Sequence, residues 1–227
     1  MTDLWLPRST CGEHCLPIAA RRNLATAALT AWRIAATTVL ILAAAVTLPF
    51  VASHSLARRF ARAVLKAAGV KHRGTGRLPD RHALIVANHV SWLDIVVILA
   101  HTPARLLAKH EVRGWPVIGR MARRLGTVFV DRTRPKTLRD TVADVAAALK
   151  EGAVVAVFPE GTTWCGRSGG WFRPAMFQAA IDAGAPVVPV RLAFSIDGAP
   201  TTVAAFLGQD TLLASVRRVV AGPWAHR

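Results

Sequence analysis

Five short apolar runs constrain the fold of this 227-residue chain more than any other feature of its sequence. Each run is four to seven residues long and is bounded by turn residues, which is typical of a buried strand. The runs cover residues 83–87, 104–108, 127–130, 153–158 and 186–192. Pro189 lies inside the last run, which predicts a strand at the edge of a sheet or at a bulge.

Helical stretches separate these runs. The clearest is 136–150, where Leu138, Val142, Ala146 and Leu149 recur at helical spacing and Gly152 follows as a stop signal. Alternating strands and helices predict an α/β fold with a largely parallel central sheet flanked by helices.

The N-terminal part of the chain is the most apolar. Residues 34–52 carry no charge, and nineteen helical residues just suffice to cross a bilayer. Many of them are Ala or Thr, and Pro49 bends or ends the helix, so a shallow insertion in one leaflet competes with a full span. The run is too long and too far from Met1 for a cleaved signal peptide.

A basic amphipathic helix is predicted over residues 54–66. Its apolar residues gather on one face: Leu56, Phe60, Val64 and Leu65. Its basic residues lie largely elsewhere: Arg58, Arg59, Arg62 and Lys66. This pattern fits a membrane-surface element, or a core-facing helix with a solvated basic face.

Three segments follow from these patterns. Residues 1–23 are expected to be a flexible tail, 24–69 a membrane-anchoring segment and 70–227 the main domain. Cys11 and Cys15 flank His14 in a metal-like spacing, but no matching cluster follows in the sequence, so the tail is the preferred interpretation. An odd total of three cysteines favours a reducing compartment.

The charge balance predicts an anionic partner. Lys and Arg number 29 against 13 Asp and Glu, which gives a net charge of +16. Tyr is absent, and no zinc-finger or RNA-binding signature occurs, so nucleic acid is not expected. An acidic membrane face or an anionic substrate fits the charge and the apolar composition together.

Chemistry-bearing residues follow three of the apolar runs. Asn88 and His89 come directly after the first, and a turn at Val90–Ser91 can fold Asp94 back onto the imidazole, as a general base and its orienting carboxylate require. Arg132 follows the third run, at a position where its guanidinium could bind a phosphate or pair with a surface carboxylate. Glu160 ends the fourth in a Pro-Glu-Gly turn.

These blocks, in this order, resemble the glycerolipid acyltransferase family, typified by 1-acyl-glycerol-3-phosphate acyltransferases. The residues that carry the resemblance are Asn88-His89-x4-Asp94, Gly126-x-x-Phe129-x-x-Arg132, Phe158-Pro159-Glu160-Gly161-Thr162 and Val188-Pro189-Val190, with Lys109-x-Glu111 and Trp115-Pro116-Val117-Ile118-Gly119 between the first two. The resemblance covers roughly residues 70 to 210 and is specific because the blocks occur together.

The resemblance implies transfer of a fatty acyl group from acyl-CoA or acyl-carrier protein to the hydroxyl of a lyso-lipid. His89 would be the base and Asp94 its partner. The implied substrate-binding residues are Asn88, Lys109, Phe129, Arg132, Glu160, Gly161, Thr162, Val188 and Pro189. No bound cofactor, metal or acyl-enzyme is implied, and the expected location is the cytoplasmic face of the cytoplasmic membrane.

One departure concerns the acceptor. Relatives that use lysophosphatidate often carry Arg after the Gly-Thr of the third block, where this chain has Thr163. A Thr-Thr version is similar to the lyso-ornithine lipid branch, and Arg167 or Arg173 would be the substitute cation. A non-catalytic lipid-binding scaffold is the alternative from a different functional class.

Overall fold

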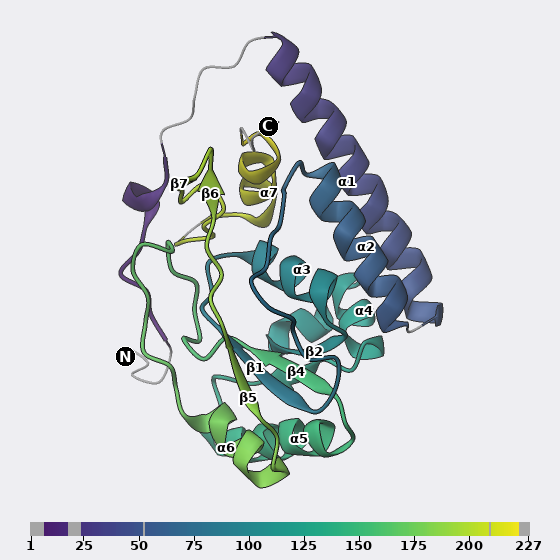
Figure 1. Ribbon diagram of the computed structural model, residues 1–227, viewed down its shortest axis with the longest axis vertical. Coiled ribbons are helices and arrows are strands. Elements are labelled where there is room, and N and C mark those ends of the chain that lie inside the picture. The colour runs from purple at the N-terminus through teal and green to yellow at the C-terminus, as the bar shows by residue number, and fades with distance from the viewer. Residues whose placement is uncertain (1–6, 18–23, 52, 209, 223–227) are drawn as a thin grey trace.

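A parallel five-stranded sheet forms the centre of the protein in the computed structural model, which describes residues 7–17, 24–51, 53–208 and 210–222 (Figure 1). Its strands lie in the order β3-β2-β4-β1-β5. Their bounds are β1 Ala83–Ala87, β2 Ala104–Lys109, β3 Val128–Val130, β4 Val154–Val157 and β5 Val187–Val190. Each strand begins and ends within two residues of its prediction, and Pro189 lies on an edge strand, as predicted.

The helices follow the strands along the chain. They are α1 Leu24–Val51, α2 His54–Ala67, α3 Trp92–His101, α4 Ile118–Arg124, α5 Leu138–Lys150, α6 Ala175–Ala183 and α7 Leu212–Val220. Short 3-10 helices cover Glu13–Cys15, His110–Gly114 and Pro135–Thr137, and β6 Ser195–Ile196 pairs with β7 Ala199–Pro200 in a separate hairpin. The predicted α/β class is confirmed.

Helices cover both faces of the sheet. Successive residues of a strand point to opposite faces, so β1 sends Leu84 and Val86 toward α5 and α6 and sends Ile85 and Ala87 toward α3. All five β1 residues are buried, as expected for the inner strand of a parallel sheet. The strands therefore form a dry core whose carboxyl ends open on one edge.

Two long helices form an outer layer beyond α3. Helix α2 packs against α3, and α1 packs along α2 and also contacts α4 and α7 (Figure 1). Helix α2 buries Ala57, Ala61, Val64 and Leu65, while Arg59 and Lys66 on its other side are exposed. Helix α2 thus packs one face on the domain and keeps its basic face exposed, which is consistent with both predicted alternatives. Helix α1 ends two residues after Pro49.

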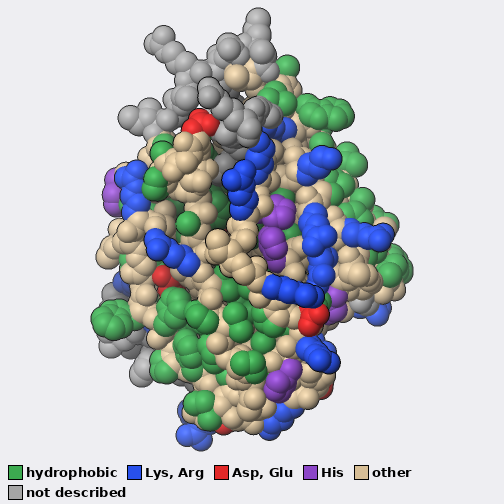
Figure 2. All heavy atoms as spheres, in the orientation of Figure 1, with side chains coloured by type: hydrophobic (Ala, Val, Ile, Leu, Met, Phe, Trp, Pro, Cys, Tyr) green, Lys and Arg blue, Asp and Glu red, His purple; other side chains and the backbone are tan. Residues whose placement is uncertain are grey.

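Helix α1 keeps an uncovered apolar face. Besides Val51 at the helix end (58%), five large side chains on it are more than half exposed: Trp32 70%, Val39 63%, Leu42 56%, Val46 65% and Phe50 84%. We call these five residues the α1 stripe. Figure 2 shows hydrophobic side chains along the edge of the molecule where α1 lies, with Lys and Arg side chains beside them. Within the described residues, only α1 is long and apolar enough to cross a membrane.

The N-terminal segment 7–17 lies against the domain, which differs from the flexible tail expected for residues 1–23 (Figure 1). Thr202 donates a hydrogen bond to the carbonyl of Cys15 at 2.6 Å, and Cys11 is buried beside Cys165. Sequence periodicity gives no sign of these contacts because the partners lie 154 and 187 residues away in the chain. Residues 1–6 and 18–23 lie outside the described part of the chain.

Candidate active site

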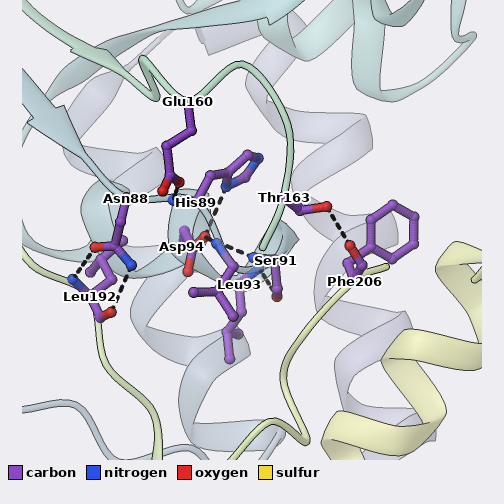
Figure 3. A network of polar contacts seen from close by, with 10 residues as sticks. Asn88, His89, Ser91, Leu93, Asp94, Glu160, Thr163, Leu192 and Phe206 are labelled. Carbon is purple, nitrogen blue, oxygen red and sulfur yellow. Dashed lines mark hydrogen bonds and ion pairs between the residues drawn. The ribbon is translucent and has the colours of Figure 1, made fainter. Parts of the chain in front are cut away.

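His89 and Asp94 meet at the carboxyl end of β1. The imidazole Nδ1 lies 2.8 Å from the Asp94 Oδ2 atom, as the five-residue spacing predicted (Figure 3). A carboxylate can only accept, so the Nδ1 atom carries the hydrogen of this bond and the Nε2 atom is left as a proton acceptor. The pair therefore has the arrangement of a general base with its orienting carboxylate.

The Asp94 carboxylate is held by the start of α3. Its Oδ2 atom also accepts the backbone N–H groups of Val90 at 2.6 Å and Ser91 at 2.8 Å. Ser91 is the N-cap of α3, and its Oγ atom accepts the N–H of Leu93. Ser91 and Asp94 also form a capping box, in which each side chain accepts the backbone N–H of the other residue. Asp94 is fully buried, and its Oδ1 atom has no hydrogen-bond partner among the described residues. One oxygen thus satisfies the helix start and fixes the imidazole.

The His89 ring lies at the boundary between core and solvent. It stacks on Phe158, with ring centroids 4.0 Å apart, and its side chain is 20% exposed. Beside it is an open pocket of about 480 Å³, lined by Asn88, Trp164 and Pro189 among others. The imidazole is fixed by packing on one face and is accessible to a small polar group in the pocket.

Glu160 lies in the pocket wall but is occupied by backbone groups. Its Oε2 atom accepts the N–H of His89 at 2.7 Å, and its Oε1 atom accepts the N–H of Gly170 at 3.0 Å. The side chain is 5% exposed. This carboxylate therefore links the strand end that bears His89 to the loop after β4, which is a different use from the substrate binding expected for it.

Asn88 joins the ends of β1 and β5. Its Nδ2 atom donates to the carbonyl of Leu192 at 3.0 Å, and its Oδ1 atom accepts the N–H of Leu192 at 2.7 Å (Figure 3). The side-chain amide thus imitates one more step of the sheet ladder beyond Val190. It holds the strand that carries Pro189 beside His89.

Arg132 lies beside the Pro-Glu-Gly turn. Its guanidinium donates a hydrogen bond to the carbonyl of Gly161. Burial lowers the pKa of Arg132, the carboxylate of Glu111 raises it, and Arg173 lowers it. Arginine stays charged at neutral pH under such shifts, so this part of the site is cationic. The Thr163 hydroxyl donates a hydrogen bond to the carbonyl of Phe206, so it does not extend this cationic part of the site (Figure 3).

Six of the nine predicted substrate-binding residues do not line the pocket: Arg132 and Gly161, described above, and Lys109, Phe129, Thr162 and Val188. Lys109 is exposed and precedes the 3-10 helix His110–Gly114. The Arg113 guanidinium lies over the Phe129 ring, with its Cζ atom 6.0 Å from the ring centroid. Val188 faces the core cluster that contains Ile85, while its neighbour Pro189 lines the pocket. Thr162 is half-buried in the turn beside Gly161.

The pocket also contains residues that the sequence did not assign to it. Arg191, Phe172 and Ser168 are part of its wall, and so is Arg167, which was named only as a substitute cation. Arg191 directly follows β5, so the rule that ligands bind at the carboxyl ends of parallel strands offered a signal for it. The loop residues had no such signal because they occupy no regular element.

Comparison with known families agrees with this geometry. The family model described as Acyltransferase matches residues 69–193, which is more than half of the chain. The protein therefore belongs to the acyltransferase family.

Individual relatives include two named activities. The lyso-ornithine lipid O-acyltransferase of Pseudomonas aeruginosa is 39% identical over 150 residues, which cover 66% of this chain and 58% of the relative. The 1-acyl-sn-glycerol-3-phosphate acyltransferase of Neisseria gonorrhoeae is 42% identical over 122 residues, which cover 52% of this chain and 48% of the relative. The chain thus spans about half the length of these curated relatives.

A solved structure shares the fold. The crystal structure of the 1-acyl-sn-glycerophosphate acyltransferase PlsC from Thermotoga maritima aligns with a TM-score of 0.52 and 27% identity, covering 73% of each chain. The resemblance proposed from the four sequence blocks is confirmed at the level of family and fold.

The Asn88 link generates a first prediction. Asn88→Ala leaves both backbone groups of Leu192 without their partner, so we expect a loss of about 1–3 kcal/mol in unfolding free energy. Thermal unfolding in detergent measures the loss, and hydrogen exchange should rise at residues 188–193. Gln178→Ala is the matched amide control, because that side chain lies on the exposed face of α6 and donates only to Asp182 one turn away. Equal protection of residues 188–193 in both variants contradicts the assigned role.

Proposed function

We propose that the protein is an O-acyltransferase that moves a fatty acyl group from a thioester donor to the hydroxyl of a lyso-lipid. The observation that carries this proposal is the His89 Nδ1 contact of 2.8 Å with a fully buried Asp94, at the wall of an open pocket. The family match supports the same reaction class. The chemistry needs a general base and a means to hold its tautomer, and this pair supplies both.

The reaction can be followed atom by atom. The Nε2 atom of His89 takes the proton of the acceptor hydroxyl as its oxygen attacks the thioester carbonyl carbon. Asp94 stabilises the imidazolium that forms. When the tetrahedral intermediate collapses, the carbon–sulfur bond breaks and the leaving thiolate takes the proton back from His89. An ester and a free thiol result, and no protein nucleophile is used.

Loss of the imidazole should remove most of the activity. We expect His89→Ala to lower the rate of thioester-dependent acylation by about 10²-fold to 10⁴-fold, the usual contribution of general base catalysis. Acyl transfer from labelled acyl-CoA and acyl-carrier protein to lyso-lipid measures it. His110→Ala removes an exposed histidine and should keep wild-type turnover. Near-wild-type turnover by a folded His89→Ala protein would falsify the enzyme proposal and favour a lipid-binding scaffold.

Two acceptors are candidates, and both fit a cationic site. Lysophosphatidate has a phosphate head group, whereas lyso-ornithine lipid has an amino-acid head group with a carboxylate. Thr163 in place of arginine, with its hydroxyl on Phe206, favours the lyso-ornithine lipid. A lipid profile of cells that lack the protein identifies the acceptor, because that lyso-lipid accumulates.

Arg132 is proposed to hold the anionic head of the acceptor. Removing a charge-assisted hydrogen bond costs about 1.5–3 kcal/mol, so Arg132→Ala should raise the KM for the acceptor about 10-fold to 100-fold. The KM for the acyl donor should change far less, as steady-state kinetics with each substrate varied in turn will show. Arg134→Ala, whose side chain is 77% exposed, is the control. Equal increases for donor and acceptor contradict this assignment.

We infer that α1 lies in one leaflet of an anionic membrane rather than crossing it. The helix packs against α2, α4 and α7, and its Arg33 is 7% exposed and donates to the carbonyls of Val220 and Gly222. A helix fastened to the domain along its length lies parallel to the membrane surface, with the α1 stripe toward the lipid. The exposed basic side chains of α2 then meet anionic head groups, and the catalytic domain stays on the cytoplasmic face.

Charges placed in the α1 stripe test this arrangement. Val39→Lys and Val46→Lys should each lower binding to phosphatidylglycerol vesicles on the order of tenfold or more, because a lysine side chain partitions poorly into lipid. Co-sedimentation measures the bound fraction. Ile181→Lys changes a side chain of similar exposure on α6, at the far side of the sheet, and should bind as wild type. Equal loss in all three variants would count against a dedicated lipid face.

A further inference from the structure

Three cysteine thiols from distant parts of the chain meet beside the pocket. The Sγ atoms of Cys11, Cys15 and Cys165 all lie within 4.8 Å of one another, and the three are free thiols. Cys11 and Cys165 are buried and Cys15 is half-buried. The sequence offered the first two as a weak metal motif without a partner cluster, and the fold brings the missing thiol from the loop after β4.

The polypeptide holds these thiols in place from several directions. The carbonyl of Cys15 accepts the Thr202 hydroxyl, and Cys165 follows Trp164, whose N–H donates to the carbonyl of His89 at 2.8 Å. The backbone N–H of Cys165 points at the Sγ atom of Cys11 at 3.4 Å. The cluster is thus part of the packed structure, with Val90 and Leu207 around it.

The spacing of the sulfur atoms matches a metal centre. Tetrahedral zinc with Zn–S bonds of about 2.3 Å places its sulfur ligands about 3.8 Å apart, so the thiols need to move inward by roughly 1 Å at most. The Ser168 Oγ atom is 3.4 Å from the Cys11 Sγ atom and 3.6 Å from the Cys165 Sγ atom, where a fourth ligand belongs. Thiolates select soft or borderline ions, of which Zn²⁺ is the common structural one.

One backbone group also favours the thiolate form of the cluster. A zinc ligand must be deprotonated, and the N–H group of Cys165 points at the Cys11 Sγ atom, where it can stabilise the negative charge.

We propose that Cys11, Cys15 and Cys165 form a structural Zn²⁺ site, with the Ser168 hydroxyl or a water molecule as the fourth ligand. On binding, the three thiols release their protons and one ion replaces them. This revises the expectation, drawn from the family resemblance, that no metal is present.

The site would fasten the N-terminal segment to the wall of the catalytic pocket. Gly166, Arg167 and Ser168 line that pocket and directly follow Cys165. Pro7 lies against Gly161, where an added Cβ would come within 2.7 Å of its ring, so segment 7–17 also reaches the Pro-Glu-Gly turn. An ion shared by both segments fixes the loop that carries Trp164 relative to His89.

Metal content of the full chain tests the site without any catalytic measurement. The protein is purified in detergent with a reducing agent and no chelator. Elemental mass spectrometry should then find about one zinc ion per chain. After stripping, Zn²⁺ titrated against a chromophoric chelator should bind again at one equivalent. Hydrogen exchange in residues 164–170 should slow when zinc is present.

Variants separate the ligands from their surroundings. Cys165→Ser and Cys15→Ser should each weaken zinc binding by at least about 100-fold, a loss that even outer-shell changes can produce. His14→Ala removes an exposed imidazole from the same 3-10 helix and should bind zinc as wild type does. His89→Ala should also bind zinc as wild type does, so the zinc proposal and the acyl-transfer proposal are tested independently.

Two results overturn the proposal. One is a reduced, metal-free wild-type chain that takes up no equivalent of zinc in the titration, a measurement that does not depend on how well a variant folds. The other is an intact mass that lacks two hydrogen atoms in the protein as isolated from cells, which makes the cluster a disulfide pair with a third thiol.

Discussion

One buried carboxylate oxygen links the three backbone and side-chain groups at the end of the sheet that carries the candidate site. Asp94 Oδ2 accepts two backbone N–H groups at the start of α3 and one imidazole N–H from His89. The first two bonds satisfy donors that every helix leaves open at its N-terminus. The spacing of five residues therefore follows from helix capping, because the aspartate is the third helical residue and the histidine lies two residues before the cap. The helix start and the orientation of the His89 imidazole depend on the same atom.

Strand positions, sheet class and this pair could be read from the sequence, because each depends on local periodicity or on short chain separations. Pro189 even indicated its place on an edge strand. The position of Cys165 beside Cys11 could not be read, because tertiary contacts across 154 residues leave no local pattern. Glu160 was recognised as part of the site, but its use was not, since only coordinates show both its oxygen atoms on backbone groups. Lys109 and Phe129 lie near the right strand ends but outside the pocket.

The outer helices show how one composition can serve two surfaces. Residues 34–52 are uniformly apolar in sequence, yet the structure divides α1 into a side buried on the domain and the exposed α1 stripe. Periodicity could not separate them because both sides are apolar. The neighbouring α2 differs, because small and branched residues face inward and basic residues face outward. Its amphipathic pattern could therefore be recognised in the sequence. Together they place an apolar surface and a basic surface side by side, the combination that suits the head-group boundary of a bilayer.

The two edges of the sheet are protected by different means. Strand β5 carries a proline, which has no N–H group to offer an incoming strand, and β3 at the opposite edge is only three residues long. An enzyme gathered on a two-dimensional surface meets its own copies at a high local concentration, where open strand edges invite cross-β aggregation. Blunted edges lower the risk that copies of this chain pair edge to edge at high local concentration.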